Sequence, residues 1–275
     1  MHYTPNTSLR VPIENQGRKI GGPTIPSQQR NLQPRVMQRR SFILKSGIVG
    51  AAALTLPNLI FSQEQDMEYS VQELMGQTDI DLYGKGINLR KEAHDAFHKM
   101  KVAAYSDGFD LKIVSSYRNY TRQEGIWERK YLKYTQDENL SALAAIEKIV
   151  EYSTIPGTSR HHWGTDIDII DGYQKTTGDV LVPEKFEAGG PFEDLKIWMD
   201  ENAQAYGFHL VYTNDKKRRG FKYEPWHYSY APISIPMLTQ FRSKNIMRLL
   251  HNQDLLGSEN FPTGFIKSYI VNNIL

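Results

Sequence analysis

The chain has 275 residues and no cysteine, which excludes disulfide bonds, thiolate metal ligands and cysteine nucleophiles. Its net charge of +2 hides an uneven distribution, because residues 1–45 carry eight basic side chains and one acidic one. Residues 46–275 therefore hold 25 basic and 30 acidic side chains, a balance of −5 that gives no electrostatic reason to expect nucleic acid as a partner.

The N-terminal part of the sequence has the composition of a leader. Residues 1–36 have no hydrophobic period, so we predict a disordered leader or an over-long start assignment. Residues 37–62 place the pair Arg39–Arg40 before the uncharged run 46–61, which is typical of a twin-arginine-type signal peptide. This run is shorter than the ~20 residues of a membrane span. We expect transient contact with the twin-arginine export machinery and a cleaved, exported chain, periplasmic or extracellular, with no stable membrane span. An uncleaved anchor and a buried helix are the alternatives.

The rest of the sequence, 63–275, is predicted to form one domain with a core at 80–231 and a C-terminal extension at 232–275. Helices mixed with short strands, without regular βαβ repetition, indicate an α+β fold. Apolar spacing and turn-forming clusters predict helices at 89–105, 122–134, 141–152, 192–206 and 237–251. Short apolar or alternating runs predict strands at 111–115, 165–170, 209–212 and 223–230, with a long surface loop at 171–191.

Two segments, 159–168 and 224–227, combine the side chains of a catalytic metal site. Together they supply two imidazoles, a carboxylate and a spare carboxylate. Catalytic zinc takes three nitrogen or oxygen ligands and keeps an open position for water, whose proton a nearby Glu can accept. Positions i and i+3 of a regular strand point to opposite faces. Glu224 and His227 therefore meet at one metal only if the backbone bends at Pro225–Trp226, and we predict this bend.

Four segments in matching order resemble the VanY-type D-alanyl-D-alanine carboxypeptidases, zinc enzymes that cut peptidoglycan stem peptides. They are the two segments above, the serine–tyrosine–arginine segment 115–123, and the helix with a glycine turn at 198–208. The resemblance covers residues 80–231. It implies a hedgehog/DD-peptidase-like fold, in which a small antiparallel sheet flanked by helices carries a zinc site.

By matching position, the resemblance implies roles for individual residues. His161, Asp168 and His227 are similar to the ligands of Zn2+. Glu224 is similar to the general base, and Arg118 to the arginine that faces the substrate carbonyl or carboxylate. The positions that contact substrate in the same pocket are Ser116, Gln123, Ser159 and Trp226.

One position departs from the family pattern. The family usually has a small residue where this chain has Asp166, so a second carboxylate approaches the site. Asp166 is either a partner that orients a ligand histidine or an alternative to Asp168 as a ligand.

The resemblance implies a zinc-dependent carboxypeptidase that removes a C-terminal D-alanine from peptidoglycan stem peptides, with metal-activated water and Glu224 as base. A peptidoglycan endopeptidase of the same family and a non-catalytic cell-wall binding protein are the alternatives. The residue that precedes the scissile bond, of D or L configuration, stays open.

Several other patterns have a simpler structural interpretation. His94 and His98 have the spacing of a helical zinc motif, but Asp95 replaces the longer Glu that the motif requires, so we predict an ordinary surface helix. His162 is an alternative to its neighbour His161 as a ligand. The basic run 215–220 is predicted to be a solvated turn, with contact to an anionic wall polymer as the alternative. Four aromatic residues near the site are predicted to pack around it, with stacking on substrate sugars as the alternative: Trp163, Trp226, Tyr228 and Tyr230.

Overall fold

A four-stranded antiparallel sheet lies at the centre of the computed structural model, which describes residues 68–251 and 254–274. The leader and signal peptide predicted at 1–62 lie outside the described residues. The strands follow the order β1-β2-β4-β3. Their bounds are Leu111–Ser115 for β1, Asp166–Asp171 for β2, Phe208–Leu210 for β3 and His227–Tyr230 for β4. The predicted α+β class and small antiparallel sheet are confirmed.

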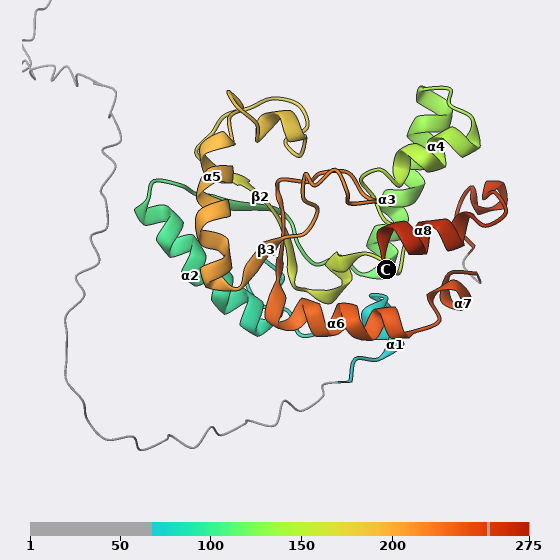
Figure 1. The fold of residues 1–275 in the computed structure, drawn as a ribbon, viewed down its shortest axis with the longest axis horizontal. Coiled ribbons are helices and arrows are strands. Elements are labelled where there is room, and N and C mark those ends of the chain that lie inside the picture. The colour runs from blue at the N-terminus through green and yellow to red at the C-terminus, as the bar shows by residue number, and fades with distance from the viewer. Residues whose placement is uncertain (1–67, 252–253, 275) are drawn as a thin grey trace, which may run out of the picture. The chain divides into compact units, whose positions relative to one another are not determined.

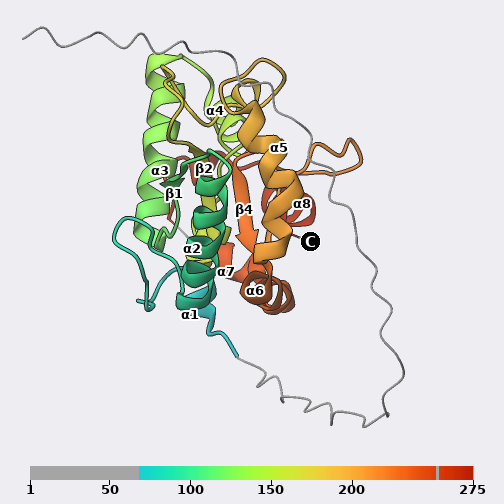
Figure 2. The same ribbon diagram turned by 90° about the vertical axis from the view of Figure 1, so that its left-hand side faces the viewer.

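Two helices cover one face of this sheet. They are α2, Lys91–Ser106, and α5, Glu193–Asn202, which lie side by side in front of the strands in Figure 2. Ile167 and Ile169 of β2 and Tyr228 of β4 point to this side and pack against apolar residues of both helices. Because side chains alternate along a strand, the residues between them face the other way. That opposite face carries the polar residues of β2 and β4.

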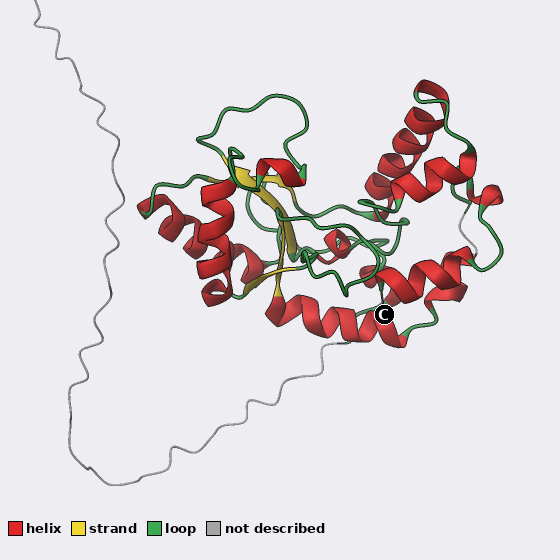
Figure 3. Cartoon of the chain, turned by 45° about the horizontal axis from the view of Figure 1, so that its top comes forward, coloured by secondary structure: helices red, strands yellow, loops and turns green. Residues whose placement is uncertain are grey.

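The remaining helices form a second apolar core on the other side of the sheet, as Figures 1 and 3 show. These helices are α1 (Val71–Leu74), α3 (Tyr120–Leu132), α4 (Ala142–Ile149), α6 (Ala231–Ser243), α7 (Ile246–His251) and α8 (Phe265–Asn273). A π-helical turn, Lys133–Asp137, continues α3. Short 3-10 turns lie at Arg160–Trp163, Pro183–Lys185, Ala203–Tyr206 and Ser258–Asn260. No helix within the described ranges is long and apolar enough to cross a membrane.

The segment after β4 belongs to this second core. Met237 and Phe241 of α6 and Ile270 of α8 pack in one cluster with Trp127 of α3 and Ile146 of α4. A polar contact adds to this packing, because the buried hydroxyl of Tyr269 accepts a hydrogen bond from the backbone N–H of Ile155 at 3.1 Å. The same hydroxyl lies 2.7 Å from the Thr158 hydroxyl. Helix α8 therefore fixes the segment 155–158, which leads directly into the first candidate metal segment.

Two element predictions were wrong in extent. The strand predicted at 223–230 is only β4, because residues 223–226 form an irregular segment and a turn. The helix predicted at 237–251 is two helices, α6 and α7, which are separated at Lys244–Asn245. Helix α6 also begins earlier than predicted, since Pro232 occupies its first turn, where a missing N–H costs nothing. The predicted surface loop 171–191 contains one short 3-10 turn.

Gly164 makes the connection between the 3-10 turn Arg160–Trp163 and β2. Its φ is 67°, and a Cβ there would lie 3.2 Å from both Ile80 Cδ1 and Leu82 Cδ2. We expect Gly164→Ala to lower the free energy of unfolding by about 1–2 kcal/mol, because a non-glycine residue is strained in the left-handed region. Urea denaturation measures this change.

Gly125, inside α3, offers a matched control. A Cβ there would meet nothing closer than 3.6 Å, so Gly125→Ala should raise the free energy of unfolding by about 0.5–1 kcal/mol through helix propensity. Equal stability of Gly164→Ala and the parent would contradict the prediction.

Candidate metal centre

The pairing of the two central strands brings two candidate ligands together. Strands β2 and β4 are antiparallel, and Asp168 lies directly opposite His227 in their register. Directly opposed residues of such a pair have Cβ atoms about 5 Å apart and point to the same face. His161 comes from the 3-10 turn that precedes β2. All three side chains are buried.

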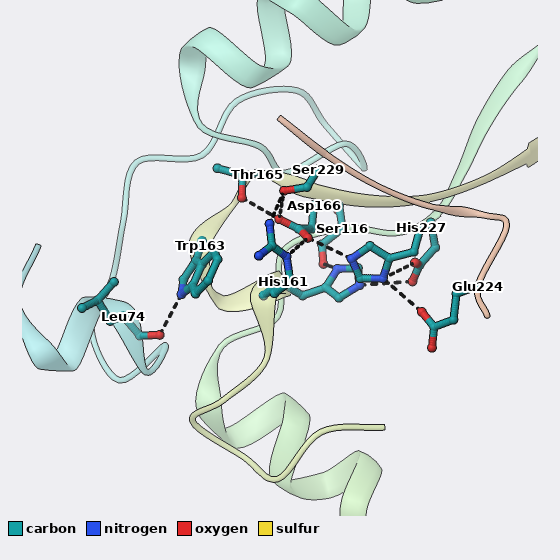
Figure 4. A network of polar contacts seen from close by, with 11 residues as sticks. Leu74, Ser116, His161, Trp163, Thr165, Asp166, Glu224, His227 and Ser229 are labelled. Atoms are coloured by element: carbon teal, nitrogen blue, oxygen red, sulfur yellow. Dashed lines mark hydrogen bonds and ion pairs between the residues drawn. The ribbon is translucent and has the colours of Figure 1, made fainter. Parts of the chain in front are cut away.

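These three residues converge on one point, as Figure 4 shows for the two histidines. His161 Nε2 lies 3.3 Å from Asp168 Oδ2, and His227 Nδ1 lies 3.3 Å from Asp168 Oδ1. One ligand atom from each residue can be chosen so that all lie within 4.8 Å of one another. Within the described ranges, this is the one group of three or more His, Asp or Glu residues with metal-site geometry. His94 and His98 are therefore not part of such a group.

Each of the two histidines directs one ring nitrogen to the centre of this group, and that nitrogen can bind a metal when it carries no proton. His161 Nδ1 is 2.7 Å from the backbone carbonyl of Ser116, which can only accept, so Nδ1 carries the proton. The buried atoms His161 Nε2 and Asp168 Oδ1 have no hydrogen-bond partner among the described residues. His227 Nε2 is 2.8 Å from Asp166 Oδ1, which directs its Nδ1 inward. Two imidazole nitrogens and a carboxylate are the donor set of a catalytic zinc site, so the group fits this metal.

Asp166 lies on the far side of the His227 ring from the other ligands. Its carboxylate is fully buried and accepts hydrogen bonds from the hydroxyls of Thr165 and Ser229 at 2.6 and 2.7 Å. The Arg160 Nε–H donates to Asp166 Oδ1 at 3.0 Å. These contacts favour the first of the two sequence interpretations, in which Asp166 orients a ligand histidine. Carboxylates in this position raise the basicity of the ligand.

The charges around His227 control its protonation in the metal-free chain. Burial lowers the pKa of His227, but the hydrogen bonds to Asp166 and Glu224 and the charge of Asp168 outweigh burial and raise the pKa to about 9. Metal binding must therefore displace a proton from His227 at neutral pH.

His162 has no lone pair for a metal, although it is adjacent to His161. Its Nδ1 lies 2.6 Å from the Arg118 carbonyl and carries the proton, and its Nε2 accepts from the Gly157 N–H at 3.1 Å. Both ring nitrogens therefore hold backbone segments that line the site. The sequence left open whether His162 replaces His161 as a ligand. This geometry does not support His162 as the ligand.

Glu224 reaches the group through the predicted bend. The His227 N–H donates to the Glu224 carbonyl at 3.1 Å, which closes a turn over Pro225–Trp226 and brings both side chains to one side. Glu224 Oε2 lies 3.2 Å from His227 Nδ1. Burial raises the pKa of Glu224 above its usual range, although the His227 hydrogen bond opposes this effect. A carboxylate with a raised pKa beside a metal position is suited to proton transfer.

The metal group opens into a cleft of about 530 Å3 that contains several of the predicted substrate residues. Arg118, Gln123, Ser159 and Trp226 line it together with Glu224. The Nε of Arg118 is buried and has no hydrogen-bond partner within the described part of the chain. Burial lowers the pKa of Arg118, and the charges of Asp168 and Glu224 oppose this shift. The Arg118 side chain thus lies beside the metal group with donors to spare.

Three predicted substrate residues have contacts within the protein. Ser116 holds His161 through its backbone carbonyl, and its side chain does not line the cleft. The Gln123 amide donates to the Thr154 carbonyl at 3.0 Å. Trp226 is 4% exposed and packs on Phe186 with ring centroids 5.6 Å apart, in agreement with the packing interpretation.

Two residues of the site were missed by the sequence analysis. The Tyr212 ring packs edge-on against His227 at 4.8 Å, and Lys130 lines the cleft from α3. Lys130 follows Gln123 by seven residues, which are about two turns of a helix, so both side chains lie on the same face. This spacing could have identified Lys130 from the sequence. No local pattern marks Tyr212.

The basic run 215–220 is a mostly exposed turn, in which Arg218 donates to the Thr213 carbonyl at 3.1 Å.

The contact between Asp166 and His227 should influence metal affinity. We expect Asp166→Asn to weaken zinc binding about 10–100-fold, because the variant loses the charge that supports the His227 Nε2–H. Competition with a chelator of known zinc affinity measures the change. Asp171→Asn at the other end of β2, where the carboxylate holds backbone N–H groups, is the control and should retain parental affinity. Parental affinity in Asp166→Asn would contradict the role of Asp166.

His162 should make the stability of the metal-free chain depend on pH. Burial lowers the pKa of His162 to about 3, so the unfolded chain binds a proton near pH 6.5 that the folded chain does not accept until the pH approaches 3. This contribution to stability is complete above pH 6.5 and is lost as the pH falls. We expect a loss of about 2 kcal/mol between pH 7 and pH 5 from this group. Urea titrations of the parent and His162→Gln measure it, and parallel losses in both would contradict it.

A family model and several known proteins match this sequence. The family model of VanY, D-alanyl-D-alanine carboxypeptidase, matches residues 86–233. The putative carboxypeptidase YodJ of Bacillus subtilis is 31% identical over 197 residues, which are 71% of this chain and 58% of that protein. A D-alanyl-D-alanine carboxypeptidase of Enterococcus faecalis is 33% identical over 133 residues, 48% of this chain and 44% of that protein. The chain thus spans about half of the length of these two relatives.

Similar chains are also found among solved structures, with lower sequence identity than the two relatives above. VanYB in complex with D-alanine-D-alanine has a TM-score of 0.47 and 23% identity, over 65% of this chain and 92% of that one. The LdcB LD-carboxypeptidase has a TM-score of 0.41 and 27% identity, over 63% and 73% of the two chains. Because the family model matches more than half of the sequence, the chain belongs to the VanY family of D-alanyl-D-alanine carboxypeptidases.

Proposed function

We propose that this protein is a zinc-dependent carboxypeptidase that removes a C-terminal D-alanine from peptidoglycan stem peptides. One observation carries the proposal. The inward ring nitrogens of His161 and His227 and a carboxylate oxygen of Asp168 meet at one point, with the buried Glu224 carboxylate 3.2 Å from His227. This is three ligands and one base at the end of a cleft, the arrangement that hydrolysis of a peptide bond by zinc requires.

Glu224 has the role of general base. Zinc, when bound, supplies a Lewis acid that polarises the scissile carbonyl and lowers the pKa of the attacking water. Glu224 accepts the proton of that water and delivers it to the leaving amine. The raised pKa of Glu224 favours the first of these two transfers, because a more basic carboxylate takes up a proton more readily near neutral pH and holds it until the amine leaves.

Arg118 has the role of binding charge on the substrate. Its buried guanidinium remains positively charged and offers several donors in a plane, which suits either the scissile carbonyl or the terminal carboxylate. Ser159 lines the same part of the cleft. Gln123 and Ser116 support the site through the contacts described above, and Trp226 forms part of the cleft wall.

The location of the substrate agrees with the sequence of the leader. Peptidoglycan lies outside the cytoplasm, and the paired Arg39–Arg40 before an uncharged run favours export through the twin-arginine machinery. We therefore place the protein in the periplasm or outside the cell. Export after folding would allow the chain to acquire its metal in the cytoplasm.

Defined muropeptides distinguish the proposal from its alternatives. The zinc-loaded chain is incubated with tetrapeptide, pentapeptide and cross-linked stems, and the products are identified by mass. Loss of one alanine from a free stem supports the carboxypeptidase and identifies the bond. Cleavage of the cross-linked stem alone would support an endopeptidase. Binding without any product would support a non-catalytic cell-wall binding protein.

Replacement of the base should separate catalysis from metal binding. We expect Glu224→Gln to lower kcat about 10²–10⁴-fold while zinc content stays equal to that of the parent, because a general base contributes this much and the three ligands remain. Zinc is measured by atomic absorption and turnover by product mass. Glu184→Gln, an exposed residue at the same cleft, is the control and should retain parental kcat. Parental turnover in Glu224→Gln would exclude Glu224 as the base.

A further inference from the structure

One wall of the cleft is a single face of helix α3. Gln123, Ile126 and Lys130 all line the cleft, and their spacing places them on the same side of the helix. Trp127 and Tyr131 on the adjoining side are buried in the second core. Arg118 lies immediately before α3, so the cleft continues from the metal group along the helix. At 1.5 Å per residue, Lys130 is ~10 Å further along this wall than Gln123.

Lys130 differs from the other lysines at this wall. It is half-buried, and it has no ion pair or hydrogen bond to any described residue. Lys148 in contrast pairs with Glu138 and lies 4.4 Å from the centre of the Tyr134 ring. Lys133 is exposed and lies 3.9 Å from the Glu138 carboxylate. Lys130 is thus a cation that lacks a partner among the described residues and opens into the cleft.

The partly buried environment of Lys130 is unfavourable for its positive charge unless an anion binds beside it. Burial lowers the pKa of Lys130, whereas the charge of Glu224 opposes that shift and Arg118 adds to it. Asp179 also faces the cleft, but it is exposed and its carboxylate accepts from the Leu181 N–H at 3.0 Å. A partly desolvated ammonium gains a charge-assisted hydrogen bond when a carboxylate arrives, so the position is suited to an anionic group of the substrate.

A stem peptide offers few free carboxylates besides the one at its C-terminus. A pentapeptide stem carries a free α-carboxylate on its γ-linked D-glutamate, three positions before the terminal D-alanine. When the third residue is meso-diaminopimelate, its side chain adds another carboxylate nearby. Both groups have the same chemistry, a free carboxylate on the N-terminal side of the scissile bond.

We propose that Lys130 is a specificity residue, whose ammonium group binds a free carboxylate of the stem peptide two to three residues before its C-terminus. This inference rests on the proposed peptidase function and adds a second anion-binding position to the one at Arg118. It means that the protein prefers stems with free carboxylates over stems in which the D-glutamate is amidated to D-isoglutamine.

Three synthetic pentapeptides test the preference with the zinc-loaded chain. The first has D-glutamate and L-lysine at positions two and three, the second has D-isoglutamine and L-lysine, and the third has D-isoglutamine and meso-diaminopimelate. We expect kcat/KM for the first peptide to exceed that for the second by about 10–100-fold, mainly through KM, as for a hydrogen bond between charged groups. A high value for the third peptide would show that a carboxylate on residue three serves as well, and a low value would show that only the carboxylate of D-glutamate is bound.

Variants of α3 connect the preference to Lys130. In Lys130→Met, the ratio between the first and second peptides should fall to near one, whereas Lys130→Arg should retain most of it. Lys133→Met, one turn further along the helix and paired with Glu138, is the matched control and should keep the parental ratio. Thermal unfolding of each variant verifies that it folds, and Lys130→Gln replaces Lys130→Met if the methionine variant does not.

Failure of this inference is distinct from failure of the proposed function. Equal cleavage of all three peptides by the parent, or a preference that persists in Lys130→Met, would overturn the role of Lys130 while the peptidase stands. Cleavage of none would overturn the peptidase. In that case calorimetric binding of the same peptides tests the inference. Tighter binding of the peptides with a free carboxylate, together with loss of this difference in Lys130→Met, would support it. Equal binding of all three peptides would overturn it.

Discussion

The register between β2 and β4 is the constraint on which the candidate site depends. Asp168 is paired with His227 and Asp166 with Ser229 along the same two strands. A shift of one residue would move every one of these side chains to the apolar face under α2 and α5. Ile167 and Ile169 of β2 oppose such a shift, because they would then leave their apolar core and enter the polar cleft. The hydrophobic packing on one face thus fixes the geometry of the polar groups on the other.

The polar groups of the site form a buried network that is incomplete at one place. Asp166, Arg160, Ser229 and Thr165 satisfy one another, and His162 is saturated by backbone groups. Buried atoms without a hydrogen-bond partner near the site include His161 Nε2, Asp168 Oδ1 and Arg118 Nε. Unpartnered buried polar atoms are unfavourable in a folded protein, so their gathering at one end of a cleft indicates where ligands bind. The metal group and the guanidinium are adjacent parts of the same incomplete network.

Much of the fold could be predicted from local sequence patterns. The strand at 111–115 is β1, and the alternation of polar and apolar residues in β2 correctly separated its two faces. The bend at Pro225–Trp226 followed from the requirement that Glu224 and His227 meet. The start of the strand at that bend could not be predicted, because aromatic residues before and after Pro225 have similar β propensity. The division of α6 from α7 likewise depends on tertiary packing rather than on helical periodicity.

The grouping of the candidate ligands could be predicted better than their surroundings. His161, Asp168, His227 and Glu224 lie together, and the sequence could name them because each matches a position of the family that it resembles. The choice between the roles of Asp166 needed the position of its carboxylate relative to the His227 ring. Tyr212 and Lys130 come from elements whose approach to the site is set by the fold as a whole. Where the sequence has no recognisable motif, its local patterns do not reveal such long-range contacts.

The contact of Tyr269 with the segment 155–158 has a consequence for the size of the folding unit. The stretch shared with the family ends at 233, yet α6, α7 and α8 supply much of the apolar surface that covers α3 and α4. A protein shortened to the shared stretch would expose that surface to water and would release the backbone that leads to His161. The smallest autonomous unit of this protein is therefore larger than the segment by which its family is recognised.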